Sequence, residues 1–341
     1  MKCDCCLVTA TRSTSSRPRR HLPTSPALGR SSRVRLRRPA PLRSKHRMTV
    51  NWAAISSLIT GLAALGALIF TGQAVTASQE QVAIAQAQNQ LAEQGQITDR
   101  YGKAVEQIGQ EGPEHLQLRL GGIYSLERIA HDSPRDQPTI LEVLLAFIRT
   151  NTHANFVAPA GSPIRANNTC STLPTTGPDI QAALAVIGRR DVKHDDYSRI
   201  NLSKACLRGA RISGRFDNAS LDYADLSGAN LSGADFNHST FLYTIFNGGF
   251  LLDANFDHAQ FPSASFLGTY LYRSNLKDAR LNGANLTNGL LNDARLNGAD
   301  LTAANFTNSI LRGVDLTGVR HDATTSMGGA QTDGATRGMW W

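Results

Sequence analysis

A repeat of five residues constrains the fold of this chain more than any other feature of its sequence. From Leu221 to Leu316 every fifth residue is Leu or Phe, and this holds for twenty consecutive positions. The residue two places before each is small, and it is Ala in twelve of the twenty cases. An α-helix repeats its buried face about every 3.6 residues and a strand every 2, so neither explains a period of five.

A coil with four short sides does explain this period. Each five-residue repeat then forms one side, with the Leu or Phe and the small residue pointing inward and the other three residues pointing outward. Self-similarity at a fixed period is typical of a solenoid, in which each unit packs only on its neighbours. Residues 20 apart in the sequence are then expected to stack at the spacing of strands, about 4.8 Å.

This arrangement predicts the columns of the core. One column is all Leu and comprises Leu231, Leu251, Leu271, Leu291 and Leu311. The other three columns place two Phe in adjacent coils, which are Phe236 over Phe256, Phe241 over Phe261 and Phe246 over Phe266. Upstream, the spacing of Leu202, Leu207 and Ile212 is one residue out of phase with Phe216, which predicts further coils joined by a one-residue deletion.

The individual repeats also follow a recognisable pattern, A-D/N-L-x-x, as in residues 224–228 and 284–288. This pattern resembles the pentapeptide-repeat family, and the resemblance implies a right-handed quadrilateral parallel β-helix. The block at residues 119–136, together with residues 101–107, resembles a bacterial subgroup of membrane-anchored pentapeptide-repeat proteins. That second resemblance covers roughly residues 50–320 and implies no activity.

The net charge of +8 is concentrated at the N-terminus. Residues 1–47 contain eleven Arg and two Lys against the single Asp4, and the rest of the chain is mildly acidic. This segment is rich in Ser and Pro, so it cannot bury a core. We interpret it as a basic disordered tail. If translation starts at Met48, these residues are not made at all. The remaining alternative is that the tail binds nucleic acid or anionic lipid.

Residues 52–70 contain no charged residue and span about 28 Å as a helix, close to the thickness of the hydrocarbon core. We predict a single-pass transmembrane anchor over residues 48–72 that contacts the lipid bilayer through residues 52–70. A signal peptide is the alternative, although the segment is long for one. Ala53, Ser57 and Gly61 lie four apart and leave a small face, so a homo-oligomer is an open alternative.

The side of the membrane follows from the flanking charges. Five Lys and Arg residues lie between positions 37 and 47, and none follows the apolar segment until Arg100. The positive-inside rule therefore places the N-terminus in the cytoplasm and the repeats outside. This bias vanishes if Met48 is the first residue.

The rest of the chain is predicted to have five further parts. Residues 73–150 form a helical stalk and hairpin, residues 151–177 a linker, and residues 178–190 a helix that caps the first coil. The β-helix occupies residues 191–320, and residues 321–341 form a flexible tail in which Trp340 and Trp341 either cover the last coil or remain free. Cys170 and Cys206 are expected to be free thiols that fix no redox compartment, and the Cys3, Cys5 and Cys6 cluster lacks the spacing of a zinc site.

No arrangement of residues in the sequence indicates catalysis, so we predict neither an enzyme nor a cofactor. One column of the repeats combines metal-ligating residue types. His238 and His258 are 20 apart and should stack on one outer corner, with Asn218 and Asp278 in the same column and Asp257 beside it. Such a set could hold a metal, but a solvated polar ladder is the preferred interpretation and no metal site is predicted.

The candidate contact surface is an acidic band at residues 217–260. This band contains six Asp and no Lys or Arg, and its members are Asp217, Asp222, Asp225, Asp235, Asp253 and Asp257. A basic protein partner is the expected ligand of such a band.

Some members of the family that the repeats resemble mimic DNA and bind a topoisomerase, which gives an alternative function. A DNA mimic should be acidic along its whole length, whereas this band covers about two coils and is flanked by basic residues. Nucleic acid is not an expected partner. The preferred function is a membrane-anchored, non-catalytic scaffold that presents a β-helix surface to an unidentified protein partner. An enzyme with an unrecognised site is the third alternative.

Overall fold

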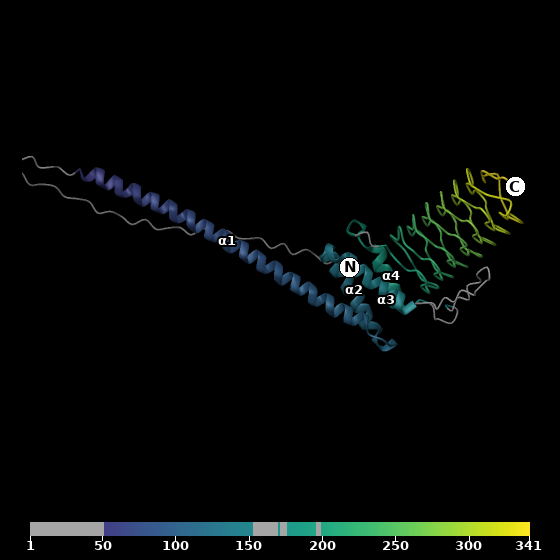
Figure 1. The fold of residues 1–341 in the computed structure, drawn as a ribbon, viewed down its shortest axis with the longest axis horizontal. Coiled ribbons are helices and arrows are strands. Elements are labelled where there is room, and N and C mark those ends of the chain that lie inside the picture. The colour runs from purple at the N-terminus through teal and green to yellow at the C-terminus, as the bar shows by residue number, and fades with distance from the viewer. Residues whose placement is uncertain (1–50, 153–169, 171–175, 196–198) are drawn as a thin grey trace, which may run out of the picture. The chain divides into compact units, whose positions relative to one another are not determined.

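The computed structural model describes residues 51–152, 170, 176–195 and 199–341. The predicted basic tail and most of the predicted linker lie outside the described residues. The chain divides into two units, residues 1–75 and 76–341. The helical elements, in order, are α1 (Trp52–Ile108), η1 (Pro113–His115), α2 (Leu116–Asp132), η2 (Pro134–Asp136), α3 (Gln137–Thr152), α4 (Pro178–Arg189) and η4 (Val192–His194) (Figure 1).

Helix α1 is continuous over 57 residues because no proline interrupts it. It contains an 18-residue window with a mean hydropathy of 2.1, and none of that window is buried. The helix is therefore long and apolar enough to cross a membrane, although signal sequences and core helices of soluble proteins share this composition. The predicted anchor and the first part of the predicted stalk belong to this one helix.

The apolar side chains of α2 and α3 belong to the same buried cluster as those of the solenoid. Ile123 and Leu126 of α2 and Ile140 and Leu144 of α3 are all at most 2% exposed. Gly122 allows the end of α1 to approach α2, since a Cβ at this position would lie 2.7 Å from the Ala104 carbonyl oxygen. The helical region, residues 104–152 and 178–190, is therefore held together by these buried side chains and by the close contact of α1 with α2 at Gly122.

The solenoid is built from parallel pairings between residues 20 apart, from Arg215 with Asp235 to Asp300 with Arg320. Four such pairings per coil give the four sides predicted from the five-residue period. Within the described residues each side contributes a single bridging residue rather than a longer strand. The coils stack in order towards the C-terminus, from green to yellow in Figure 1.

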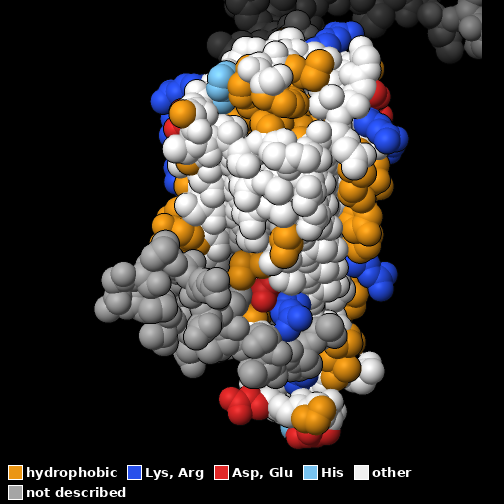
Figure 2. Space-filling view, turned by 90° about the vertical axis from the view of Figure 1, so that its right-hand side faces the viewer, with side chains coloured by type: hydrophobic (Ala, Val, Ile, Leu, Met, Phe, Trp, Pro, Cys, Tyr) orange, Lys and Arg blue, Asp and Glu red, His pale blue; other side chains and the backbone are white. Residues whose placement is uncertain are grey.

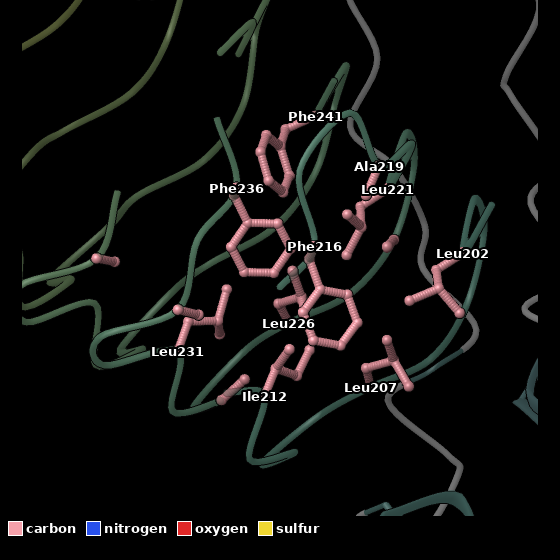
Figure 3. Packing of buried hydrophobic residues seen from close by; sticks show 14 of the residues in the cluster. Leu202, Leu207, Ile212, Phe216, Ala219, Leu221, Leu226, Leu231, Phe236 and Phe241 are labelled. Atoms are coloured by element: carbon pink, nitrogen blue, oxygen red, sulfur yellow. The ribbon is translucent and has the colours of Figure 1, made fainter. Parts of the chain in front are cut away.

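The inward positions form the predicted core. All twenty Leu and Phe residues of the repeat are at most 1% exposed. The ring centroids of Phe241 and Phe261 lie 4.7 Å apart, and those of Phe246 and Phe266 lie 4.8 Å apart, with interplanar angles of 5° in both pairs. Figure 3 shows how Leu and Phe from successive coils meet inside the solenoid. The predicted columns are confirmed.

Polar residues at the small inward positions are satisfied by the backbone. The hydroxyl of Ser239 donates to the Phe216 carbonyl oxygen at 3.0 Å, and that of Thr244 donates to the Leu221 carbonyl oxygen at 2.8 Å. Because these buried hydroxyls have partners, Ser and Thr replace Ala without leaving an unpaired polar group.

The register changes at both ends of the solenoid. In the first coil Asn201, Cys206 and Arg211 pair with residues 19 positions further on, which confirms the predicted deletion. At the other end the pairings of Asn305 with Ser326 and of Asp315 with Arg337 reveal insertions. The coils therefore continue to Arg337, in contrast to the flexible tail predicted over residues 321–341. Trp340 is partly buried against the core, and its ring stacks on His321 at 4.3 Å.

The helical region covers the open edge of the first coil. The Gln181 side chain accepts a hydrogen bond from the Arg211 backbone N–H at 2.8 Å and donates to its carbonyl oxygen at 2.5 Å, as a neighbouring strand would. The Gly188 carbonyl oxygen accepts from the Arg215 N–H at 3.0 Å, and the Thr152 carbonyl oxygen accepts from the Cys206 N–H at 2.8 Å. The Arg149 side chain donates to the Asn201 carbonyl oxygen at 2.8 Å, so all four sides have a partner.

Cys170 and Cys206 form a disulfide, so the prediction of two free thiols is wrong. The two residues are 36 apart in the sequence, and their pairing depends on where the first coil lies against the end of α3. No local spacing could have indicated it, because the partner is brought in by the tertiary fold.

Candidate functional site

The six Asp residues of the predicted acidic band do not form one surface. The outward residues of one side, taken through successive coils, make up one face of the solenoid. Asp222, Asp225 and Asp253 belong to three different faces, and the fourth face carries Asp217, Asp235 and Asp257. The structure therefore distributes the predicted contact residues around the whole coil.

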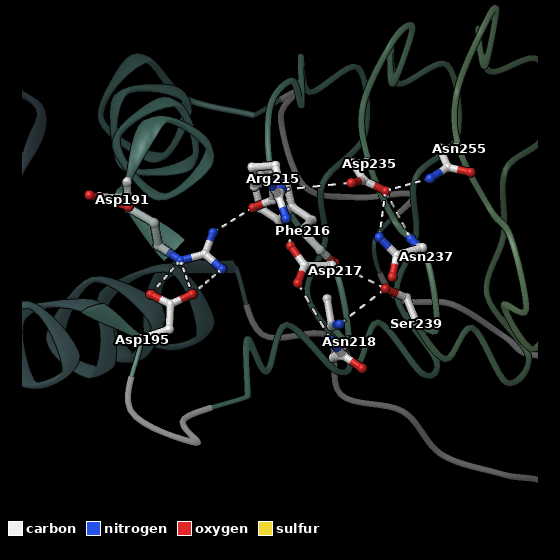
Figure 4. Close-up of polar contacts among 12 residues, drawn as sticks. Asp191, Asp195, Arg215, Phe216, Asp217, Asn218, Asp235, Asn237, Ser239 and Asn255 are labelled. Carbon is white, nitrogen blue, oxygen red and sulfur yellow. Dashed lines mark hydrogen bonds and ion pairs between the residues drawn. The ribbon is translucent and has the colours of Figure 1, made fainter. Parts of the chain in front are cut away.

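Arg215 and Arg273 pair with three of these carboxylates. The Arg215 Nε atom lies 3.4 Å from Asp217 Oδ1 and 3.7 Å from Asp235 Oδ2 (Figure 4). Arg273 pairs with both carboxylate oxygens of Asp253, at 2.7 and 2.6 Å. This arginine holds the pKa of Asp253 below its usual range, and the Asp253 carboxylate in turn raises the pKa of Arg273. Both arginines lie outside residues 217–260, so the sequence window did not include them.

Several of the carboxylates also hold the backbone of the coil. Asp225 is only 5% exposed and accepts from the Ser227 N–H at 2.9 Å. Asp222 accepts from the Leu242 N–H one coil further on, at 2.8 Å. Among the described residues visible in Figure 2, carboxylates on the solenoid are scattered and form no continuous acidic surface.

One face of the solenoid instead carries a row of large apolar side chains. We call it the apolar face and define it by Phe250, Leu252, Tyr270, Tyr272, Leu290 and Ile310. The ring centroids of Phe250 and Tyr270 lie 4.8 Å apart with an interplanar angle of 13°, and those of Tyr270 and Tyr272 lie 6.4 Å apart. Phe250 is 42% exposed, and the other five residues are half-buried. The row extends over four coils.

Charged residues border the apolar face at one corner. Asp253, Arg273, Asp293 and Arg295 line a shallow depression there. An apolar centre with a charged and polar rim is the usual anatomy of a protein–protein interface. Sequence reasoning missed this face because its members are 20 residues apart, although listing the outward positions at that interval would have found it.

The neighbouring face shows that exposure alone does not make such a row. Leu267 is 42% exposed, like Phe250, but its counterparts in the adjacent coils are Asn247 and Thr287. It is therefore a single apolar residue in a polar column. Isolated exposed apolar residues are normal on a protein surface, whereas a contiguous row indicates a contact site.

The histidine column is assembled as predicted. The ring centroids of His238 and His258 lie 5.0 Å apart with an interplanar angle of 34°. Asp257, His258 and Asp278 each offer a ligand atom, and these atoms lie within 4.8 Å of one another. All three residues are partly exposed, at the corner between two faces.

Charged residues of the helical hairpin form ion pairs rather than a common site. Arg119 of α2 lies 2.7 Å from Asp179 of α4, and Glu127 of α2 lies 2.7 Å from Arg189 of α4. These pairs join α2 to α4, so they position the helix that covers the first coil.

The fold and its surface define a β-solenoid with a covered first coil and a row of large apolar side chains along one outer face. Residues 215–251, 251–288 and 279–318 match the family of pentapeptide repeats, with eight copies. The solenoid is therefore a pentapeptide-repeat domain. No curated protein matches the chain.

Similar solved structures are also pentapeptide-repeat proteins. HetL, which is involved in heterocyst differentiation regulation in the cyanobacterium Nostoc sp. strain PCC 7120, is 23% identical over 39% of this chain and 81% of its own, with a TM-score of 0.17. A protein of the Arabidopsis thaliana thylakoid lumen is 32% identical over 28% of this chain and 71% of its own, with a TM-score of 0.16. QnrB1, a plasmid-mediated fluoroquinolone resistance protein, is 18% identical over 37% of this chain and 90% of its own, with a TM-score of 0.16.

Proposed function

We propose that the chain is a membrane-anchored, non-catalytic scaffold whose apolar face binds a protein partner. The observation that carries this proposal is the row of six large apolar side chains on a single face of the solenoid. Pentapeptide-repeat proteins are generally structural or interaction proteins, which agrees with a role in binding.

The solenoid is well suited to such a role because its surface is fixed before binding. The backbone of each coil is hydrogen-bonded to its neighbours. Tyr270 pairs with Gly249 and Leu251 of the preceding coil, and the flanking Thr269 and Leu271 pair with Leu290 of the next coil. A preformed surface loses little conformational entropy on association, so more of the gain from burying Phe250 and Tyr270 contributes to affinity. Stacked aromatic rings at the centre of a patch are common energetic anchors of interfaces.

Two observations support a location on the outer side of a membrane. The apolar part of α1 is long enough for one span, and the basic residues before it favour a cytoplasmic N-terminus. The disulfide between Cys170 and Cys206 adds an independent argument, since disulfides persist in oxidising compartments and are rare in the cytosol. We place the pentapeptide-repeat domain outside on these grounds.

The distribution of charge argues against a mimic of DNA. Arg215 and Arg273 neutralise acidic residues within the band itself, and the six Asp residues lie on four faces. Duplex DNA presents unpaired charge along its whole length. We therefore do not favour binding to a topoisomerase by this route.

Site-specific photo-crosslinking in cells tests the proposed contact surface. A photoreactive phenylalanine analogue is introduced at Phe250, and at Leu267 as a matched control of equal exposure on the adjacent face. We expect a discrete crosslinked product of higher mass from position 250 and little or none from position 267. Equal products at the two positions, or none at either, would contradict the assignment of the apolar face as the binding surface.

A further inference from the structure

A column of metal-ligating side chains at one corner of the solenoid has no part in the proposed contact surface. His238, His258 and Asp278 occupy the same corner position in three successive coils. Their φ angles are 57°, 57° and 53°, so all three side chains leave the backbone in the same left-handed conformation. The repeat thereby brings groups from different coils within reach of a common ligand.

The carboxylate beside His258 favours one of its two tautomers. Its Nδ1 atom lies 3.0 Å from Asp257 Oδ2, a contact that favours the proton on Nδ1 and leaves the lone pair on Nε2. The Nε2 atom lies 3.8 Å from Asp278 Oδ2. That distance is too long for a hydrogen bond. Two electron-pair donors from adjacent coils therefore face each other.

The separation between these two atoms fits two ligands of one small cation. With metal–ligand bonds of about 2.0–2.2 Å and a tetrahedral angle, two ligand atoms lie about 3.4 Å apart. A movement of a few tenths of an ångström closes the difference. In addition, Asp257 Oδ1 is buried and has no hydrogen-bond partner among the described residues. A nearby cation would offset the cost of burying this carboxylate oxygen.

We propose that this corner binds a divalent cation of the zinc class. His258, through Nε2, and Asp278, through its carboxylate, are the ligands, and Asp257 is a positioning residue that fixes the tautomer of His258. A mixed imidazole and carboxylate set favours zinc, nickel or copper over magnesium and calcium. His238, whose ring lies 5.0 Å from that of His258, is the nearest additional imidazole.

Binding at this site would join two adjacent coils through their side chains. Lys277 Nζ lies 3.4 Å from Asp278 Oδ2 and competes with a cation for that oxygen. The Lys277 side chain is about half exposed, so it can move into solvent when the cation binds.

Calorimetric titration with zinc chloride tests the proposal on the full chain in detergent. Cys3, Cys5 and Cys6 are changed to Ser in every protein, because thiols at the N-terminus also bind zinc. We expect saturable binding of one zinc ion, with loss of binding in His258→Ala and in Asp278→Asn. Asp257→Asn should weaken affinity by about 10- to 100-fold, the usual effect of removing a group that orients a ligand.

Controls separate coordination from general effects of substitution. His131→Ala removes an exposed histidine that also lies beside a carboxylate, at 3.6 Å from Asp132, and it should leave zinc binding unchanged. Cobalt chloride gives a second readout, since its visible spectrum should change on adding wild-type protein and not on adding His258→Ala. If Asp257→Glu binds zinc more tightly than Asp257→Asn, and both variants melt at the same temperature as wild type, the positioning role of Asp257 is supported. Absence of zinc binding, or equal binding by wild type and His258→Ala, would overturn the proposal.

Discussion

A single inward residue strongly affects the stability of the solenoid, because each side of each coil contributes only one large side chain to a continuous core. Leu251 is fully buried in the column that contains only Leu. We expect Leu251→Ala to lower the free energy of unfolding by about 2–5 kcal/mol, from lost burial and the cavity left behind. Leu251→Asp should prevent folding of the coils, since it buries an unpaired charge.

Circular dichroism and thermal melting measure these effects on the purified chain. Leu251→Phe provides the comparison, since overpacking typically costs about 1–3 kcal/mol and neighbouring columns already hold Phe. If the Asp variant melts like wild type, position 251 does not point into a dry core and the arrangement of the coil is wrong.

A single carboxylate fixes the turn into the last coil and makes it sensitive to acid. Asp322 accepts hydrogen bonds from the Thr324 hydroxyl and from the Ala303 N–H, which lower its pKa to about 2. Because the folded pKa lies below the unfolded value of about 3.9, the carboxylate stabilises the folded turn above the unfolded pKa. This stabilisation is lost as the pH falls through about 2.

An NMR titration of the carboxyl carbon of Asp322 checks this expectation directly. We expect a midpoint near 2, accompanied by changes in the amide signals of Thr324 and Ala303. Asp322→Asn should remove the pH dependence of those amide signals. A midpoint near that of an ordinary Asp would show that the turn is not held in this way.

At the level of elements, α4 completes the first coil by replacing a missing neighbour. The Gln181 side chain pairs with both backbone groups of Arg211. We expect Gln181→Ala to destabilise the solenoid by about 0.5–1.5 kcal/mol, the usual net contribution of a hydrogen bond, because it leaves the edge backbone groups of Arg211 to water. Gln181→Glu keeps the acceptor and loses the donor, so its effect should be intermediate.

Hydrogen exchange of the Arg211 amide gives the local measurement for this prediction. Protection should fall in Gln181→Ala and be retained in Gln181→Glu, whose carboxylate still accepts from this N–H. Unchanged protection in Gln181→Ala would mean that α4 does not cover this edge.

The core could be predicted from the sequence, but most of the contacts on the surface could not. The five-residue period specifies the inward Leu and Phe, because burial imposes the same requirement on every repeat. The outward residues carry no such period, so the pairing of Asp253 with Arg273 and the row from Phe250 to Ile310 emerge only when the coil is closed. The final coil was missed because insertions before Ser326 and Arg337 break the spacing. The disulfide was missed because its partners meet through tertiary structure.

At the level of the whole molecule, we propose that a membrane anchor is joined to a pentapeptide-repeat domain on the outer side. The apolar segment of α1, the flanking basic residues and the Cys170–Cys206 disulfide support this combination from independent observations. An outer location also determines which partners can reach the apolar face.

Labelling of an engineered cysteine in intact cells tests this central claim most directly. Ala323 is exposed and lies in the last coil, so Ala323→Cys offers a thiol to a membrane-impermeant maleimide. The wild-type chain is the control, since its Cys170 and Cys206 are paired and its N-terminal cysteines lie on the cytoplasmic side in this account. We predict labelling of Ala323→Cys in intact cells and none of the wild type. Labelling of Ala323→Cys only after lysis would place the solenoid in the cytoplasm and contradict the account.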